Sequence, residues 1–238
     1  MTWRLAICFS LFVALGIPAT VRGKISIQEA NGKRAKPLQL SNVVIWLNDS
    51  NPETTALVRA NAVKAKIVQK NKTFIPHVLA IPVGSSVEFP NADPIFHNAF
   101  SNYNGQIFDI GLYPPGSTRT VRFQKPGIVR VFCNIHASMS AVIVVLNSPW
   151  FATSNPDGVF EINEVPEGTY TLDIYYERAT EQALSSLQRT VSVGSGAVDL
   201  GTITISESGY LSIPHLNKYG KPYPSAESDP GAYPGARP

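Results

Sequence analysis

Short apolar runs alternate with turn-forming residues along most of the chain. The runs are rich in Val, Ile, Phe and Tyr, and Gly, Pro and Asn stand between them, which is typical of β-strands joined by tight turns. The predicted strands of the first half are Lys24–Gln28, Val43–Leu47, Ile67–Gln69, Val78–Ile81, Ser86–Phe89, Phe96–Phe100, Ser117–Phe123, Ile128–Phe132 and Ala141–Leu146. This spacing favours an all-β sandwich or barrel. The stretch Pro52–Lys66 fits either a short helix or an exposed loop.

A second β-unit is predicted after Pro149. Its strands are Val159–Ile162, Thr169–Glu177, Leu187–Val193 and Leu200–Ile205, with room for one helical turn within Arg178–Ser186. The pattern predicts a small separate β-sandwich over residues 149–206. This half shows no set of residues that would carry catalysis.

The two ends of the chain differ from the rest. Arg4 followed by the apolar run Leu5–Ile17, with small residues at Val21 and Gly23, predicts a secretory signal peptide over residues 1–23 and export to the periplasm or beyond. No later run approaches the ~18 apolar residues of a membrane span. Residues 207–238 are rich in Pro, Gly and Tyr, which predicts a disordered tail with His215 in solvent.

Charge and cysteine content narrow the function. The formal charge of the 238-residue chain is only +3, so no nucleic-acid partner is indicated. The chain has 2 Cys, too few for a disulfide scaffold. Cys8 would leave with the signal peptide, and Cys133 would remain unpaired in an oxidising compartment. It could be a buried thiol, a reactive thiol, an intermolecular bridge or a metal ligand.

Soft metal ligands surround Cys133 in the sequence. Cys133, His136 and Met139 form a Cys-x2-His-x2-Met motif between two predicted strands, and His97 lies at the start of an earlier one. Two His and one Cys with a weak axial Met are diagnostic of a blue-copper site. We therefore predict one copper ion that cycles between Cu(I) and Cu(II). Zinc is less suited, because structural zinc sites usually carry more Cys.

These motifs resemble the cupredoxin family. The match runs from Thr73 to Leu146, and its compact ligand loop is similar to that of amicyanin and of plastocyanin-like methylamine-utilisation proteins. The resemblance implies a cupredoxin-like Greek-key β-sandwich over residues 24–148, with an N-terminal β extension. Residues from Thr153 to Glu177 separately resemble the small transthyretin-like or carboxypeptidase-regulatory β-sandwiches.

The resemblance also implies roles for single residues. His97, Cys133, His136 and Met139 would be the copper ligands, and His136 would be the electron exit. Asn98 would lock the ligand loops and tune the Cys133 sulfur. An apolar rim for docking a redox partner would consist of Pro94, Ile95 and Ala137. The ligand loop departs from the family pattern because it contains no Pro.

Several functions fit these residues. The first is a periplasmic electron carrier, not an enzyme, that serves a cytochrome or dehydrogenase. The alternative is a copper protein for transport, storage or sensing. A multicopper enzyme would need more His than the spare His77 and His215, and a module without metal would leave the motif unused. His77 could be a further copper contact, although a partly exposed strand residue is the better interpretation.

Overall fold

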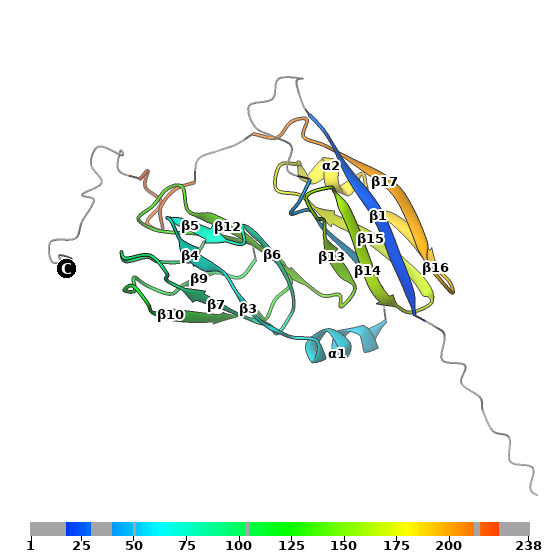
Figure 1. The fold of residues 1–238 in the computed structure, drawn as a ribbon, viewed down its shortest axis with the longest axis horizontal. Coiled ribbons are helices and arrows are strands. Elements are labelled where there is room, and N and C mark those ends of the chain that lie inside the picture. Colours follow the sequence, from blue (N-terminus) through cyan, green and yellow to red (C-terminus); the bar gives the residue numbers. More distant parts are fainter. Residues whose placement is uncertain (1–17, 30–39, 50, 103–104, 212–214, 224–238) are drawn as a thin grey trace, which may run out of the picture.

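The fold comes from a computed structural model that describes residues 18–29, 40–49, 51–102, 105–211 and 215–223. It is all-β, as predicted, and contains two sandwiches side by side (Figure 1). None of the helices in these ranges has the length and apolarity to cross a membrane.

The first sandwich contains the predicted ligand loop and most of the strands predicted for the cupredoxin-like domain. One sheet has the strand order β6-β12-β11-β8-β9 and the other β10-β7-β3, with the hairpin β4-β5 beside them. Its strands are β3 (Lys64–Lys66), β4 (Val68–Lys70), β5 (Thr73–Ile75), β6 (Val78–Pro82), β7 (Ser86–Pro90), β8 (Phe100–Ser101), β9 (Phe108–Asp109), β10 (Thr118–Arg122), β11 (Gly127–Phe132) and β12 (Ser140–Leu146). Residues of both sheets, such as Val87 and Val131, pack into one buried core.

The second sandwich is built from both ends of the described chain. Its sheets have the orders β14-β1-β17 and β13-β2-β15-β16. The strands are β1 (Ala19–Gln28), β2 (Val44–Asn48), β13 (Phe151–Thr153), β14 (Val159–Val165), β15 (Gly168–Tyr175), β16 (Arg189–Val193) and β17 (Val198–Ser206). The predicted domain boundary is therefore wrong at the N-terminal side, because β1 and β2 belong to this sandwich. Its likeness to transthyretin stays a prediction.

The first strand also crosses the predicted signal-peptide boundary. Ala19 and Val21 are 1% and 0% exposed and pair with Val165 and Ile162 of β14. The in–out alternation of apolar side chains continues from Ile25 back to Ala19. A cut after Gly23 would remove half of β1, so this boundary does not fit the fold. Residues 1–17 of the predicted signal peptide lie outside the described residues.

Two short helices connect the strands. Helix α1 (Pro52–Ala60) begins at Asn51, whose side chain accepts a hydrogen bond from the Glu53 N–H, and Pro52 occupies its first turn. It resolves the open choice at Pro52–Lys66 as a helix followed by β3. Helix α2 (Glu181–Ser185) lies within the predicted helical turn.

An apolar contact joins the sandwiches. Val44 of β2 and Tyr175 of β15 pack against Val78, Val142 and Val144 of the first sandwich in one buried cluster. The two faces leave water together, so burial of apolar area holds the sandwiches against each other.

Candidate metal centre

The predicted ligand loop connects β11 to β12 and is closed by its own backbone. The Cys133 N–H donates to the Met139 carbonyl at 3.2 Å, and the Met139 N–H donates to the His136 carbonyl at 3.1 Å. Strands β11 and β12 pair antiparallel up to Phe132 and Ser140. The sheet therefore continues to the base of the loop and fixes where its side chains start.

His97 comes from a segment earlier in the chain that lies beside the ligand loop. Its backbone forms an isolated bridge with Tyr113, with N–H to O distances of 3.2 and 2.9 Å in the two directions. The predicted strand Phe96–Phe100 is thus mostly irregular, since only Phe100 enters β8. The bridge holds the His97 backbone in the core, where its side chain is 0% exposed.

The structure brings three predicted ligands together. The ligand atoms of His97, Cys133 and His136 all lie within 4.8 Å of one another. The Cys133 Sγ is 4.0 Å from His97 Nδ1 and 3.7 Å from His136 Nδ1. Metal–sulfur and metal–nitrogen bonds of about 2.3 and 2.0 Å, at angles near 120°, separate S and N by about 3.7 Å. The two sulfur–nitrogen distances therefore suit one ion of this size bound by the sulfur and both nitrogens.

The fourth predicted ligand is buried beside them. Met139 is 0% exposed and shares the core cluster of Cys133. Its backbone bonds to both Cys133 and His136 tie it to the other loop ligands. A thiolate, two imidazoles and a thioether are soft donors, and this donor chemistry suits copper better than Mg²⁺ or Ca²⁺.

Asp93 orients His97, a role that the sequence analysis missed. Asp93 Oδ2 accepts a hydrogen bond from His97 Nε2 at 2.8 Å, which leaves Nδ1 as the nitrogen facing the sulfur. The carboxylate also accepts from the N–H groups of Asn71 and Lys72 at 2.6 and 2.8 Å. Burial opposes ionisation of Asp93, but these bonds outweigh it and lower its pKa. The spacing Asp-x3-His was the available signal.

Asn98 links the two ligand segments. Its side-chain oxygen accepts from the Asn134 N–H at 3.2 Å, and its amide donates to Asp109 Oδ1 at 2.8 Å and to the Gly111 carbonyl at 3.1 Å. These bonds hold the loop of Cys133 against the segment of His97. Asn98 therefore stands where the resemblance expected a locking residue.

The Cys133 thiol lies in an apolar setting with backbone donors. Burial raises its pKa in the metal-free chain, and hydrogen bonds from the backbones of Ile135, Asn98 and His136 partly oppose this. N–H groups aimed at the sulfur stabilise a thiolate, the form that binds a metal. Among the described residues, Cys133 is the one cysteine, and it forms no disulfide.

The ligands differ in their access to solvent. Cys133, His97 and Met139 are buried, whereas His136 is half-buried. Of the predicted docking rim, Pro94 and Ala137 are exposed and Ile95 is partly exposed. His136 is thus the predicted ligand closest to the surface.

His77 lies outside this centre. Its Nδ1 is 3.0 Å from the Ser140 carbonyl, and its Nε2 is 2.5 Å from Glu177 Oε2 of the second sandwich. The bond to Glu177 raises the pKa of His77, although burial partly opposes it. His77 therefore joins the two sandwiches, and its ring nitrogens are already engaged.

The C-terminal segment is not free in solvent, contrary to the prediction. Residues 215–223, which we call the clasp, lie on the ligand loop (Figure 1). The His215 ring stacks on Phe132 with centroids 4.0 Å apart. The predicted disorder of residues 224–238 falls outside the described residues.

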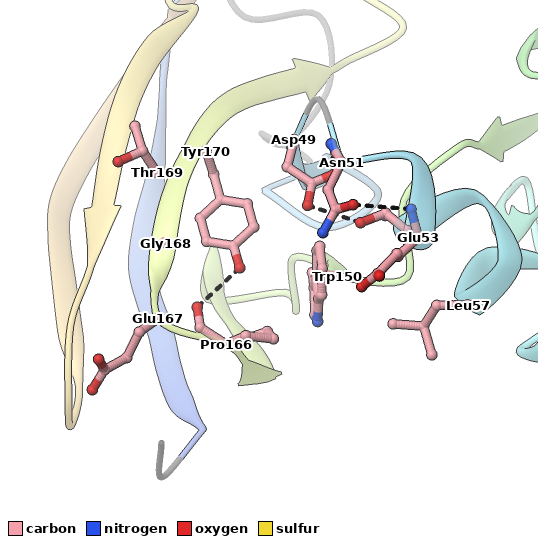
Figure 2. A pocket seen from close by; sticks show the side chains of 11 residues that line it. Asp49, Asn51, Glu53, Leu57, Trp150, Pro166, Glu167, Gly168, Thr169 and Tyr170 are labelled. Atoms are coloured by element: carbon pink, nitrogen blue, oxygen red, sulfur yellow. Dashed lines mark hydrogen bonds between the residues drawn. The ribbon is translucent and has the colours of Figure 1, made fainter. Parts of the chain in front are cut away.

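A separate pocket of about 690 Å³ lies between α1 and the second sandwich (Figure 2). Its lining includes Trp150, Tyr170, Asp49, Glu53 and Glu167. The Tyr170 hydroxyl is already bonded to the Pro166 carbonyl. None of the predicted metal ligands lines this pocket, so it is distinct from the metal centre.

No protein-family model and no curated protein matches the chain. Among solved structures, a copper-containing nitrite reductase from Thermus scotoductus SA-01 is 29% identical, with a TM-score of 0.34. The match covers 35% of this chain and 22% of that one, so the chain spans under a quarter of the enzyme's length.

Two smaller proteins are also similar. A purple cupredoxin from Nitrosopumilus maritimus is 24% identical over 34% of this chain and 99% of its own, with a TM-score of 0.31. A variant of amicyanin in its reduced state is 17% identical over 43% of this chain and 98% of its own, with a TM-score of 0.33. The case for a metal rests on the chain's own ligand atoms.

Proposed function

We propose that the chain is a type 1 copper protein that transfers single electrons between exported redox proteins. The observation that carries the proposal is the trio of His97, Cys133 and His136, whose ligand atoms lie within 4.8 Å of one another. A copper ion bound there would supply the one-electron chemistry. The chain's own residues would hold the ion, exclude water from it and leave one ligand near the surface.

The packing around the trio supports electron transfer. Asp93 accepts a hydrogen bond from His97, and Asn98 accepts one from the Asn134 N–H, so the ligand atoms keep their places when the charge of the ion changes. Burial of Cys133 and His97 keeps water and substrates away from the ion. Electrons would pass through half-buried His136 to a cytochrome or dehydrogenase docked near Pro94, Ile95 and Ala137. We expect no catalysis of bond-making reactions.

Absorption spectroscopy tests the proposal. The purified protein should become intensely coloured on addition of Cu(II), because a thiolate–copper bond absorbs visible light strongly. Cys133→Ser should remove the colour, and His97→Gln should weaken or remove it. His77→Gln replaces a histidine away from the centre in the same way and should leave the colour intact.

Redox cycling separates the two copper functions. An electron carrier should be reduced and reoxidised repeatedly without losing its ion. A colourless Cu(II) complex would refute a type 1 site, and copper that is held but does not cycle would favour transport, storage or sensing.

A further inference from the structure

The clasp is an ordered turn. The Asn217 side-chain oxygen accepts from the N–H groups of Tyr219 and Lys221 at 2.9 and 3.1 Å. The Gly220 N–H donates to the Asn217 carbonyl at 2.9 Å, and Gly220 has the positive φ of 70° that such a turn requires of glycine. Its shape is therefore set by its own bonds.

Three hydrogen bonds attach this turn to the ligand loop. The Tyr223 hydroxyl donates to the carbonyl of Cys133 at 2.6 Å, and the Lys218 N–H donates to Asn134 Oδ1 at 3.0 Å. His215 Nε2 lies 2.8 Å from the carbonyl of Ala137. The contacts therefore involve the ligand Cys133 and two other loop residues, Asn134 and Ala137.

The clasp also reaches the segment of His97. Lys218 Nζ forms a 2.8 Å ion pair with Asp109 Oδ2, and Asp109 Oδ1 accepts from the Asn98 amide. Burial disfavours the ionised Asp109, but the hydrogen bond from Lys218 helps to lower its pKa. One residue of the clasp therefore bonds directly to the ligand loop and, through Asp109 and Asn98, to the other ligand segment.

We propose that residues 215–223 position the ligand loop, with His215, Lys218 and Tyr223 as positioning residues. The loop has no Pro to stiffen it, and its exposed backbone would otherwise open easily. Because the clasp forms hydrogen bonds with carbonyls of the ligand loop, it keeps Cys133 buried and keeps its sulfur close to His97. The effect of the clasp on copper binding rests on the proposed function. Its effect on the position of the ligand loop does not, because that effect applies to the metal-free protein as well.

The test for the loop needs no metal. In metal-free full-length protein, labelling of Cys133 by a thiol reagent, followed by peptide mass spectrometry to exclude Cys8, measures how often the loop opens. Tyr223→Phe keeps the ring but removes the hydroxyl, and His215→Ala removes a second contact. We expect the double variant to label at least about tenfold faster than the wild type. Tyr210→Phe, a tail tyrosine outside the clasp, is the matched control.

Unfolding midpoints in urea show whether the variants keep their fold. A faster label with an unchanged midpoint supports local positioning, and a rate within twofold of the wild type overturns the proposal. In copper-loaded protein, release of Cu(I) to a chelator should accelerate in the same order. If the wild type binds no copper, the proposed function fails while the labelling result still decides the role of the clasp.

Discussion

Replacing Asp93 with Asn tests how far a residue outside the ligand set controls the centre. The Asp93 carboxylate is 7% exposed and accepts three hydrogen bonds, from Asn71, Lys72 and His97. An amide offers one acceptor oxygen and one NH₂ donor, so at least one of these buried or partly buried N–H groups loses its partner. An unsatisfied buried donor costs about 1–3 kcal/mol, which should appear in the free energy of unfolding of the metal-free protein.

The copper affinity should fall further. Loss of a hydrogen bond that orients a metal-ligating His typically weakens binding about 10–100-fold, or roughly 1.4–2.8 kcal/mol. Competition with a Cu(I) chelator measures the affinity, and urea unfolding measures the stability. Asp157→Asn makes the same change in an exposed turn of the second sandwich and should alter neither. An affinity within about threefold of the wild type, together with unchanged stability, would refute the orienting role of Asp93.

Other predictions concern the scaffold. The exported protein should begin at or before Ala19, as N-terminal mass spectrometry can show; a start beyond it would contradict the pairing of β1. His77→Gln should cost most stability between about pH 4.5 and 6.5, where Glu177 with its lowered pKa and His77 with its raised pKa are both charged. The loss should shrink as pH rises through the raised pKa of His77; a pH-independent loss would disprove the ion pair. Val144→Ala at the contact between the sandwiches should cost about 2 kcal/mol in urea unfolding, whereas Val159→Ala at an exposed site should cost far less.

The ligand loop could be predicted from the sequence because its chemistry is local. Cys133, His136 and Met139 fall within one loop, and alternating apolar residues define the strands on either side. Asp93 was harder to identify, because a carboxylate near a His becomes an orienting group only when the fold buries both.

Two errors had a common origin in composition. The apolar run Leu5–Ile17 led to a predicted signal-peptide boundary after Gly23, although the alternating pattern of β1 already begins at Ala19. The Pro, Gly and Tyr content of the tail indicated disorder, although Asn217 and Gly220 are turn formers. In both places, contacts with residues distant in the sequence decide the structure, and composition does not record them.

The second sandwich takes strands from both sides of the first sandwich in the sequence, so it can be completed only after the first has been synthesised. Strand β1 pairs with β14 and, in parallel, with β17, and β17 is the last strand of the sandwich to be synthesised. The first sandwich, by contrast, is contiguous from β3 to β12. Contacts between distant residues form slowly, so the metal-binding half can close while β1 is still unpaired. The completed second sandwich then holds together the two ends of the first sandwich.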